Sequence, residues 1–191
     1  MDWSVLFIGP PGAGKTGAIA AVSDIEVVRT EAVSSEKLGP GKSHTTVAMD
    51  VGAVSLGGGE RLRLVGAPGQ PRFDFMWDIL LPSAAGIVVL VDRSRPDPAA
   101  DLAYYVGQAR SREGAVRKPM VIGVTHTDVA GPACALMQRA AWSGDCRCSE
   151  CRPPMLEVDA RDPRDVRVLL LALTAQLEMA HRFPSRHTQM R

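Results

Sequence analysis

The sequence predicts an α/β fold in which a mostly parallel sheet lies between two layers of helices. Three observations support this prediction. Short apolar runs alternate with segments of helical pattern along the chain. A glycine-rich loop follows the first run directly, and Gly57-Gly58-Gly59 separates two others as a hairpin turn would. Alternating strands and helices imply parallel strands joined by crossover helices, and the hairpin adds one antiparallel edge strand.

The apolar runs predict a sheet of six strands. The first and fourth runs are continuously apolar, which is typical of strands buried on both faces. The third, Arg61-Leu62-Arg63-Leu64-Val65, alternates charged and apolar residues as a half-buried strand does. The predicted strands are residues 5–8, 46–56, 61–65, 86–91, 120–124 and 155–158.

Helices are predicted at residues 16–22, 99–112 and 133–142, with a last helix beginning at Asp162-Pro163. Aspartate is a good N-cap, and proline fits the first helical position. An apolar stripe at helical spacing predicts that the last helix packs on the sheet through Val166, Leu169, Leu170, Leu173 and Leu177. The length of 191 residues suits one domain, assigned to residues 1–180, followed by a polar tail at 181–191.

Composition excludes some classes of function. The chain has 22 Lys and Arg against 21 Asp and Glu, a net charge of +1, whereas proteins that coat nucleic acid by charge usually have a basic excess. No apolar run approaches the ~20 residues of a membrane-spanning helix, and the N-terminus does not resemble a signal peptide. We therefore expect a cytoplasmic protein without nucleic-acid partners or a transmembrane segment.

The strongest motif is a phosphate-binding loop. Residues 9–16 read Gly-Pro-Pro-Gly-Ala-Gly-Lys-Thr and fit the pattern G-x-x-x-x-G-K-[ST], with a buried strand before and a helix after. Such a loop turns its backbone N–H groups toward phosphates, while Lys15 reaches the β- and γ-phosphates and the Thr16 hydroxyl binds Mg²⁺. The predicted phosphate-binding residues are Gly9, Pro10, Pro11, Gly12, Ala13, Gly14, Lys15, Thr16 and Gly17.

The loop does not identify the base, because GTPases, ATPases and kinases all use it. Four later segments occur in the order found in Ras-like small GTPases. The resemblance implies that Thr46, with Thr45 beside it, binds Mg²⁺ and the γ-phosphate. In Gly66-Ala67-Pro68-Gly69-Gln70 it implies that the Gly69 N–H approaches the γ-phosphate and that Gln70 orients the attacking water. Gly66 stands where the family has an acidic residue.

Two further segments resemble the base-binding elements of the same family. Thr125-His126-Thr127-Asp128 is similar to the guanine-recognition element, and the resemblance implies that Asp128 accepts hydrogen bonds from guanine. His126 replaces the usual lysine and Thr125 the commoner asparagine. The segment after the last predicted strand resembles the element whose alanine N–H contacts the base, which adds the candidates Asp159, Ala160 and Arg161.

The combined motifs are similar to the small GTPases of actinobacterial conservon operons, which are related to the gliding-motility GTPases. This resemblance rests on Lys-x-x-Thr-Thr-Val-Ala-Met-Asp and Gly-x-Pro-Gly-Gln-x-Arg-Phe-x-Phe-Met-Trp. It implies roadblock-type regulators, a sensor kinase complex and peripheral membrane association through these partners. The apolar residues after Gln70 either contact such regulators or pack a helix onto the sheet: Phe73, Phe75, Met76 and Trp77.

Four cysteines form a second candidate site. Their thiolates could bind zinc, although ordinary free thiols and redox sensing are alternatives and the spacing is only moderately suggestive. The residues are Cys134, Cys146, Cys148 and Cys151.

These observations predict a GTP-binding switch that holds GTP or GDP with Mg²⁺ and hydrolyses GTP slowly. Lys15 and Gln70 are the predicted catalytic residues, and Thr16 and Thr46 the predicted metal ligands. One alternative is an ATP-using P-loop enzyme. Another is a pseudo-GTPase scaffold with little hydrolysis, which Gly66 and the altered 125–128 motif would favour.

Overall fold

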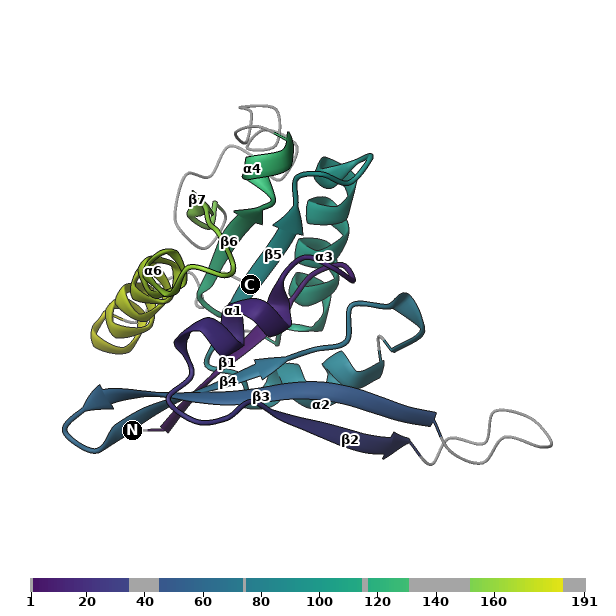
Figure 1. Cartoon of the computed structure of the whole chain (residues 1–191). Helices are drawn as coiled ribbons and strands as arrows, with labels where there is room; N and C mark the ends of the chain where they lie inside the picture. The colour runs from purple at the N-terminus through teal and green to yellow at the C-terminus, as the bar shows by residue number, and fades with distance from the viewer. Residues whose placement is uncertain (1, 35–44, 74, 115–116, 131–151, 184–191) are drawn as a thin grey trace, which may run out of the picture.

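The computed structural model describes residues 2–34, 45–73, 75–114, 117–130 and 152–183. Over these residues the chain forms one seven-stranded sheet in the order β2-β3-β4-β1-β5-β6-β7 (Figure 1). The strands are β1 (Asp2–Ile8), β2 (Val28–Ser34), β3 (Thr45–Gly57), β4 (Glu60–Gly66), β5 (Gly86–Asp92), β6 (Met120–Thr125) and β7 (Met155–Glu157). The helices are α1 (Lys15–Val22), α2 (Phe75–Ser83), α3 (Pro98–Arg112), α4 (Thr127–Ala130) and α6 (Pro163–Arg182), with a 3-10 turn at Pro71–Phe73.

The predicted fold class is confirmed: the mostly parallel sheet, with its antiparallel hairpin, has the architecture of a P-loop sandwich. β3 runs antiparallel to both of its neighbours, and the remaining neighbouring pairs are parallel. The predicted hairpin is present, and its turn uses Gly57, Gly58 and Gly59 at φ of +86°, +60° and +85°. The structure adds β2 at the edge, in a stretch where the sequence shows no clear strand pattern.

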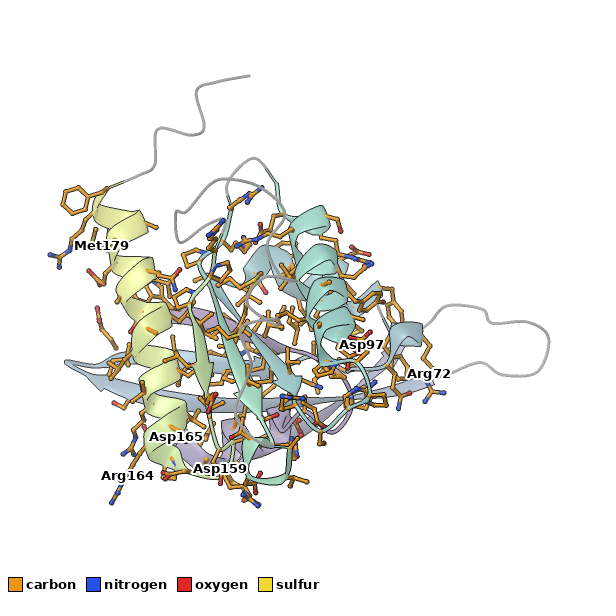
Figure 2. All side chains as sticks on the ribbon, turned by 90° about the horizontal axis from the view of Figure 1, so that it is seen from above. Arg72, Asp97, Asp159, Arg164, Asp165 and Met179 are labelled. Carbon is orange, nitrogen blue, oxygen red and sulfur yellow. The ribbon has the colours of Figure 1, made fainter. Side chains whose placement is uncertain are left out.

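Helices cover both faces of the sheet and create two cores. Successive side chains of β1 point to opposite faces of the sheet. Leu6 and Ile8 face α2 and α3, whereas Val5 and Phe7 face α1 and α6. All four residues are at most 1% exposed. Figure 2 shows α6 and α3 on opposite sides of the sheet. Burial on both faces explains why the central strands have continuous apolar sequences.

Helix α6 has the start and the packing face predicted from sequence. The Asp162 side chain accepts a hydrogen bond from the Arg164 N–H, and Pro163 occupies the first turn. The predicted apolar stripe is buried, with Val166, Leu169 and Leu173 at 0% exposure. Because α6 is amphipathic, its apolar face packs against α1 and against β5 and β6 of the sheet.

The loops after β1, β4, β5, β6 and β7 meet at one edge of the sheet. These five strands are mutually parallel, so their carboxyl ends share that edge. In open α/β sheets, ligands bind outside the carboxyl ends of the strands. The fold therefore brings the motifs of residues 9–16, 66–70, 125–128 and 159–161 into one region.

Two predictions concern segments outside the described residues: the helix at 133–142 and the zinc site at Cys134, Cys146, Cys148 and Cys151. Within the described ranges, no three His, Cys, Asp or Glu side chains gather as a metal-binding group. The described helices include none long and apolar enough to cross a membrane.

Candidate functional site

The loop between β1 and α1 depends on glycine at three positions. Gly9, Gly12 and Gly14 have φ of +142°, +84° and +89°, which L side chains rarely adopt. A Cβ at Gly9 would lie 2.1 Å from the Leu90 carbonyl oxygen, and one at Gly14 would lie 2.7 Å from the Ala160 Cβ. Gly14 is the N-cap of α1, so the first N–H groups of this helix open toward the loop. This end of a helix attracts anions such as phosphate.

Lys15 is buried inside this loop. Its side chain is 9% exposed, and Nζ donates hydrogen bonds of 2.8 Å to the carbonyl oxygens of Gly9 and Pro10. Burial lowers the pKa of Lys15 to about 8, and the nearby Asp50 carboxylate offsets part of this shift. A phosphate in the loop would offer Nζ a charged acceptor and would favour the ammonium form.

Asp50 is a site residue that the sequence analysis missed. The Thr16 hydroxyl donates a hydrogen bond to its Oδ2. Asp50 lies on β3 directly opposite Gly66 of β4, and a Cβ at Gly66 would be 3.3 Å from the Asp50 Cβ. The Asp50 carboxylate of β3 therefore lies beside Gly66 of β4. Gly66 is the position at which Ras-like GTPases have an acidic residue. Counted outward from the Gly57–Glu60 pair, Asp50 would lie opposite Ala67, and an irregularity between Ser55 and Gly57 shifts it to Gly66.

The loop after β4 lies against the phosphate loop. A Cβ at Gly69 would lie 2.5 Å from the Gly9 carbonyl oxygen and 2.8 Å from the Lys15 Nζ, so only glycine fits this approach. The Tyr105 hydroxyl on α3 donates a 2.7 Å hydrogen bond to the Gly69 carbonyl. Gln70 follows with an exposed side chain. The predicted pair Gly69 and Gln70 is thus next to the phosphate loop.

The third part of the site is a cavity of about 140 Å³ beside the start of α1. It brings together three segments that are far apart in the sequence: the phosphate loop and α1, the 125–128 motif, and the loop after β7. Its lining residues are Gly14, Gly17, Thr125, His126, Thr127, Asp128, Val158, Asp159, Ala160 and Arg161. The cavity thus contains the residues that were predicted to contact a base.

Thr125 connects this cavity to the phosphate loop. Its side chain is 1% exposed, and its hydroxyl lies 3.2 Å from the carbonyl oxygens of Ala13 and Val91. The next residue, His126, has a φ of +58°. Among the described residues, it is the only one other than glycine with a positive φ. Its Nδ1 lies 3.3 Å from Asp92 Oδ1. Thr125 therefore holds the two loops together, which is a positioning role.

Arg161 joins two carboxylates at the mouth of the cavity. It donates two 2.8 Å hydrogen bonds to Asp159, from Nε to Oδ1 and from a terminal nitrogen to Oδ2, and one of 3.0 Å to Asp128. The bonds from Arg161 lower the pKa of Asp159 to about 2 and raise the pKa of Arg161. The Asp159 carboxylate is therefore ionised at neutral pH.

Thr46 is not brought to the rest of the site. It lies on β3 four residues before Asp50 and pairs with Val33 of β2. At ~3.3 Å per residue, its backbone is about 13 Å along the strand from the residue that contacts Thr16. The predicted pairing of Thr16 and Thr46 at a metal is therefore not present in this structure, and Asp50 is the nearer oxygen donor.

The apolar residues after Gln70 pack onto the sheet. Phe73, Met76 and Trp77 are 8%, 5% and 1% exposed and belong to the core beneath α2 and α3. Of the two alternatives for this segment, the packing role is confirmed. Their burial removes these three side chains as a surface for regulators.

Fold and loop together define a P-loop nucleotide-binding protein. A family model described as "conserved hypothetical ATP binding protein" matches residues 25–176, and the chain belongs to this family. The match begins after the phosphate loop, so the loop and the family model indicate a bound nucleotide independently. No curated protein matches the chain.

The family match corrects the predicted relationship to conservon-type, Ras-like GTPases, which is wrong. That relationship was inferred from short motifs after the phosphate loop, and such motifs recur among P-loop proteins because they perform similar tasks at the same sheet edge. The roadblock-type regulators, the sensor kinase and the peripheral membrane association were implied by that relationship alone. They lose their support with it.

Proposed function

We propose that the protein is a P-loop nucleoside triphosphatase that binds ATP with Mg²⁺ and hydrolyses its terminal phosphate. The observation that carries this proposal is the arrangement of Lys15, Thr16 and Asp50 around the loop after β1. It combines the backbone N–H groups at the start of α1, a buried ammonium and a hydroxyl from the first turn of that helix, and a carboxylate from β3. Phosphate esters with a bound divalent cation need this set of groups.

Thr16 and Asp50 fit Mg²⁺ by their chemistry. Both offer oxygen donors, which this ion prefers, and Mg²⁺ usually takes only one or two protein ligands together with phosphates and water. The bond between the two side chains shows that they reach the same point. Bound Mg²⁺ would neutralise charge on the phosphates. The Asp50 carboxylate then supplies the negative charge that an acidic residue would supply at position 66.

Hydrolysis is assigned to the loop that carries Gly69 and Gln70. The close approach of Gly69 to Lys15 puts its backbone within reach of a terminal phosphate. Gln70 has an exposed side chain that is free to turn toward a water molecule beside that phosphate. Lys15 stabilises the charge that develops on the phosphate oxygens. No arginine is assigned to this charge, and turnover is expected to be slow.

The family description supports adenine as the base, whereas one feature of the cavity favours guanine. Asp128 offers a carboxylate at the mouth, and guanine presents two adjacent donors, N1–H and the exocyclic amine, that a carboxylate accepts together. Adenine lacks this pair. Arg161 already donates to Asp128, so a guanine would have to share or replace that bond. GTP is therefore the second candidate.

A competition titration tests the proposal. Purified protein is loaded with a fluorescent nucleotide, which ATP, GTP or GDP then displaces, with Mg²⁺ and with EDTA. We expect displacement by ATP and a loss of binding in Lys15→Ala. Arg167→Gln, an exposed position on α6, is the control and should bind normally.

Asp128→Asn separates the two bases. A guanine site loses GTP affinity by tenfold or more, because the amide presents donors where acceptors are needed, and an adenine site changes little. Phosphate release measured on the same samples tests hydrolysis. Tight binding with no release in the presence of Mg²⁺ would support a binding scaffold and would refute the assignment of Gln70.

A further inference from the structure

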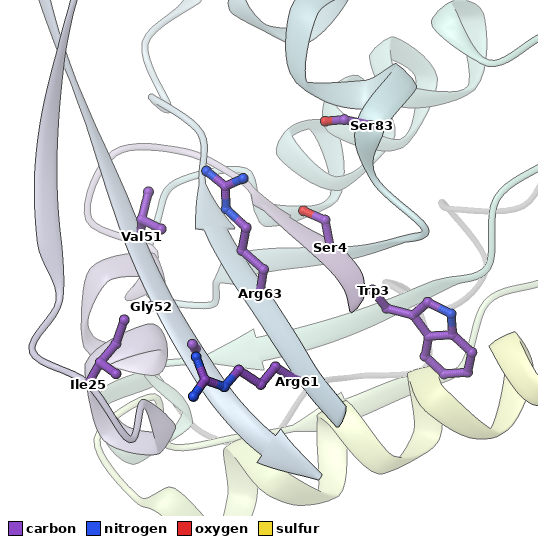
Figure 3. A pocket seen from close by; sticks show the side chains of 9 residues that line it. Trp3, Ser4, Ile25, Val51, Gly52, Arg61, Arg63 and Ser83 are labelled. Carbon is purple, nitrogen blue, oxygen red and sulfur yellow. The ribbon is translucent and has the colours of Figure 1, made fainter. Parts of the chain in front are cut away.

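A second cavity lies at the other end of the sheet from the phosphate loop. It has a volume of about 470 Å³ and is bordered by the start of β1, the middle of β3, the first half of β4 and the end of α2 (Figure 3). Ser4, Val51, Arg61, Arg63 and Ser83 are among its lining residues. This volume is in the range of ligand-binding cavities. None of these residues belongs to the proposed nucleotide site.

The position of the cavity follows from residue alternation in β4. Leu62 and Leu64 are buried in the core beneath α1 and α6, so Arg61 and Arg63 point to the opposite face of the sheet. On that face α2 contacts β1 and α3 contacts β5. The helices leave the β3–β4 part of this face accessible, and both arginines are exposed there.

Arg61 and Arg63 give this groove a local positive charge. Among the described residues neither guanidinium has an ion pair, whereas six other arginine-to-carboxylate pairs occur in the same part of the chain. Two positions along a strand place their Cα atoms about 7 Å apart. Like charges at this distance repel each other, and an anionic occupant would relieve that repulsion.

The arrangement of the two arginines indicates what kind of anion fits. Figure 3 shows their guanidinium groups directed to different places, Arg63 between Val51 and Ser4 and Arg61 toward Ile25, instead of converging on one point. A single phosphate would need convergent groups. An extended peptide repeats its side chains on one face at the same ~7 Å interval and can offer each guanidinium its own carboxylate.

The remaining lining suits the rest of a peptide. Val51 is half-buried and Ile25 is 49% exposed, so they offer apolar contact beside the arginines. The Ser4 hydroxyl lies on the adjoining strand and can donate to a carboxylate or to a peptide carbonyl. An aliphatic residue on the same face of the peptide, two positions from a carboxylate, would fix the register of the peptide.

We propose that this groove is a docking site for an acidic peptide segment of a partner protein, with carboxylates on alternate residues and an aliphatic residue near them. The carboxylates pair with Arg61 and Arg63, and the aliphatic side chain packs on Val51 and Ile25. The site is distinct from the nucleotide site and does not depend on the identity of the nucleotide.

Fluorescence anisotropy with the full chain tests this. The probe is a fluorescein-labelled peptide, Gly-Glu-Ser-Glu-Ser-Leu-Gly, in which both carboxylates and the leucine lie on one face of an extended chain, and the control peptide has glutamine in place of glutamate. We expect saturable binding of the acidic peptide, at least tenfold weaker binding to the double variant Arg61→Gln/Arg63→Gln, and weaker binding at high salt. The matched control is Arg164→Gln/Arg167→Gln, which removes two exposed charges from α6 and should leave binding unchanged.

Three results would overturn the proposal: no binding of the acidic peptide, equal binding of the glutamine peptide, or equal loss in both double variants. Stronger competition by inorganic phosphate or by single-stranded RNA than by unlabelled peptide would do the same. Thermal melting of both double variants verifies that each is folded. Unchanged nucleotide binding in these variants keeps the result separate from any failure of the proposed nucleotide site.

Discussion

Replacing Asp50 by asparagine tests the contribution of β3 to the phosphate site. The carboxylate accepts a hydrogen bond from Thr16 and lies close enough to Lys15 to raise its pKa. The variant keeps the size of the side chain and removes the charge. With Mg²⁺ present, we expect the nucleotide to lose affinity, because one oxygen donor near the metal becomes neutral. Without Mg²⁺, we expect equal or tighter binding, because a negative charge near the phosphates is gone.

The size of the effect follows from the kind of bond that is lost. A hydrogen bond to a charged group contributes about 1.5–3 kcal/mol, and each 1.4 kcal/mol changes an equilibrium constant about tenfold. The affinity in Mg²⁺ should therefore fall by about 10- to 100-fold. Asp50→Gly combined with Gly66→Asp moves the acid to the partner strand. This double variant should recover part of the loss, since removing the Asp50 side chain relieves the 3.3 Å contact with a Cβ at Gly66 and leaves only a 3.1 Å contact with the end of the Ile19 side chain.

The assay is a titration of fluorescent nucleotide in Mg²⁺ and in EDTA, with Glu178→Gln on the exposed side of α6 as a control for charge. The decisive quantity is the ratio of the two affinities. If Asp50→Asn weakens binding by the same factor with and without Mg²⁺, Asp50 only supports the structure of the loop and the metal assignment is refuted.

Three further predictions follow from buried groups. Burial disfavours the protonated form of Lys15, so this group lowers the stability of the fold below pH 8, and the loss disappears as the pH rises from 8 to 10.5. Nucleotide affinity should fall above pH 8, because the ammonium that contacts the phosphates is lost. Comparison with Lys15→Met across this pH range isolates the contribution of Lys15. Tyr105→Phe removes the bond to the Gly69 carbonyl and should lower the free energy of unfolding by about 1 kcal/mol in urea titrations, whereas no change would show that solvent replaces this bond. Leu169→Ala at a fully buried position should cost about 2–5 kcal/mol by the same measurement, and a loss below 1 kcal/mol would contradict the packing described for α6.

Much of the fold could be predicted from sequence because local patterns determine it. The apolar runs of β1, β5 and β6 are buried on both faces, and the glycine turn, the Asp162 cap and the leucine stripe each have a local cause. β2 was missed because an edge strand is stabilised by pairing with β3, and its own sequence carries a weaker signal. The extra strand leaves the architecture unchanged.

Site residues that belong to one continuous motif could be predicted from the sequence. Residues that reach the site through the pairing of two strands were harder to predict. Residues 9–16 are one uninterrupted segment, and the strand before it and the helix after it lie where the sequence predicts them. Asp50 depends on a register between two strands, and Thr46 was placed by analogy with another family, although β3 carries its backbone away from Thr16. The ion pair of Arg161 with Asp128 joins the loop after β7 to the segment after β6, which no local pattern records.

The bond between Tyr105 and the Gly69 carbonyl gives the protein a built-in optical reporter. Tyr105 packs against Trp77 with ring centroids 5.6 Å apart, and the buried indole Nε1 of Trp77 has no hydrogen-bond partner among the described residues. A movement of Gly69 toward a phosphate would break or displace its bond to the Tyr105 hydroxyl and so change the surroundings of that indole. In a variant with Trp3 and Trp142 replaced by phenylalanine, we expect the emission of Trp77 to change when this loop moves.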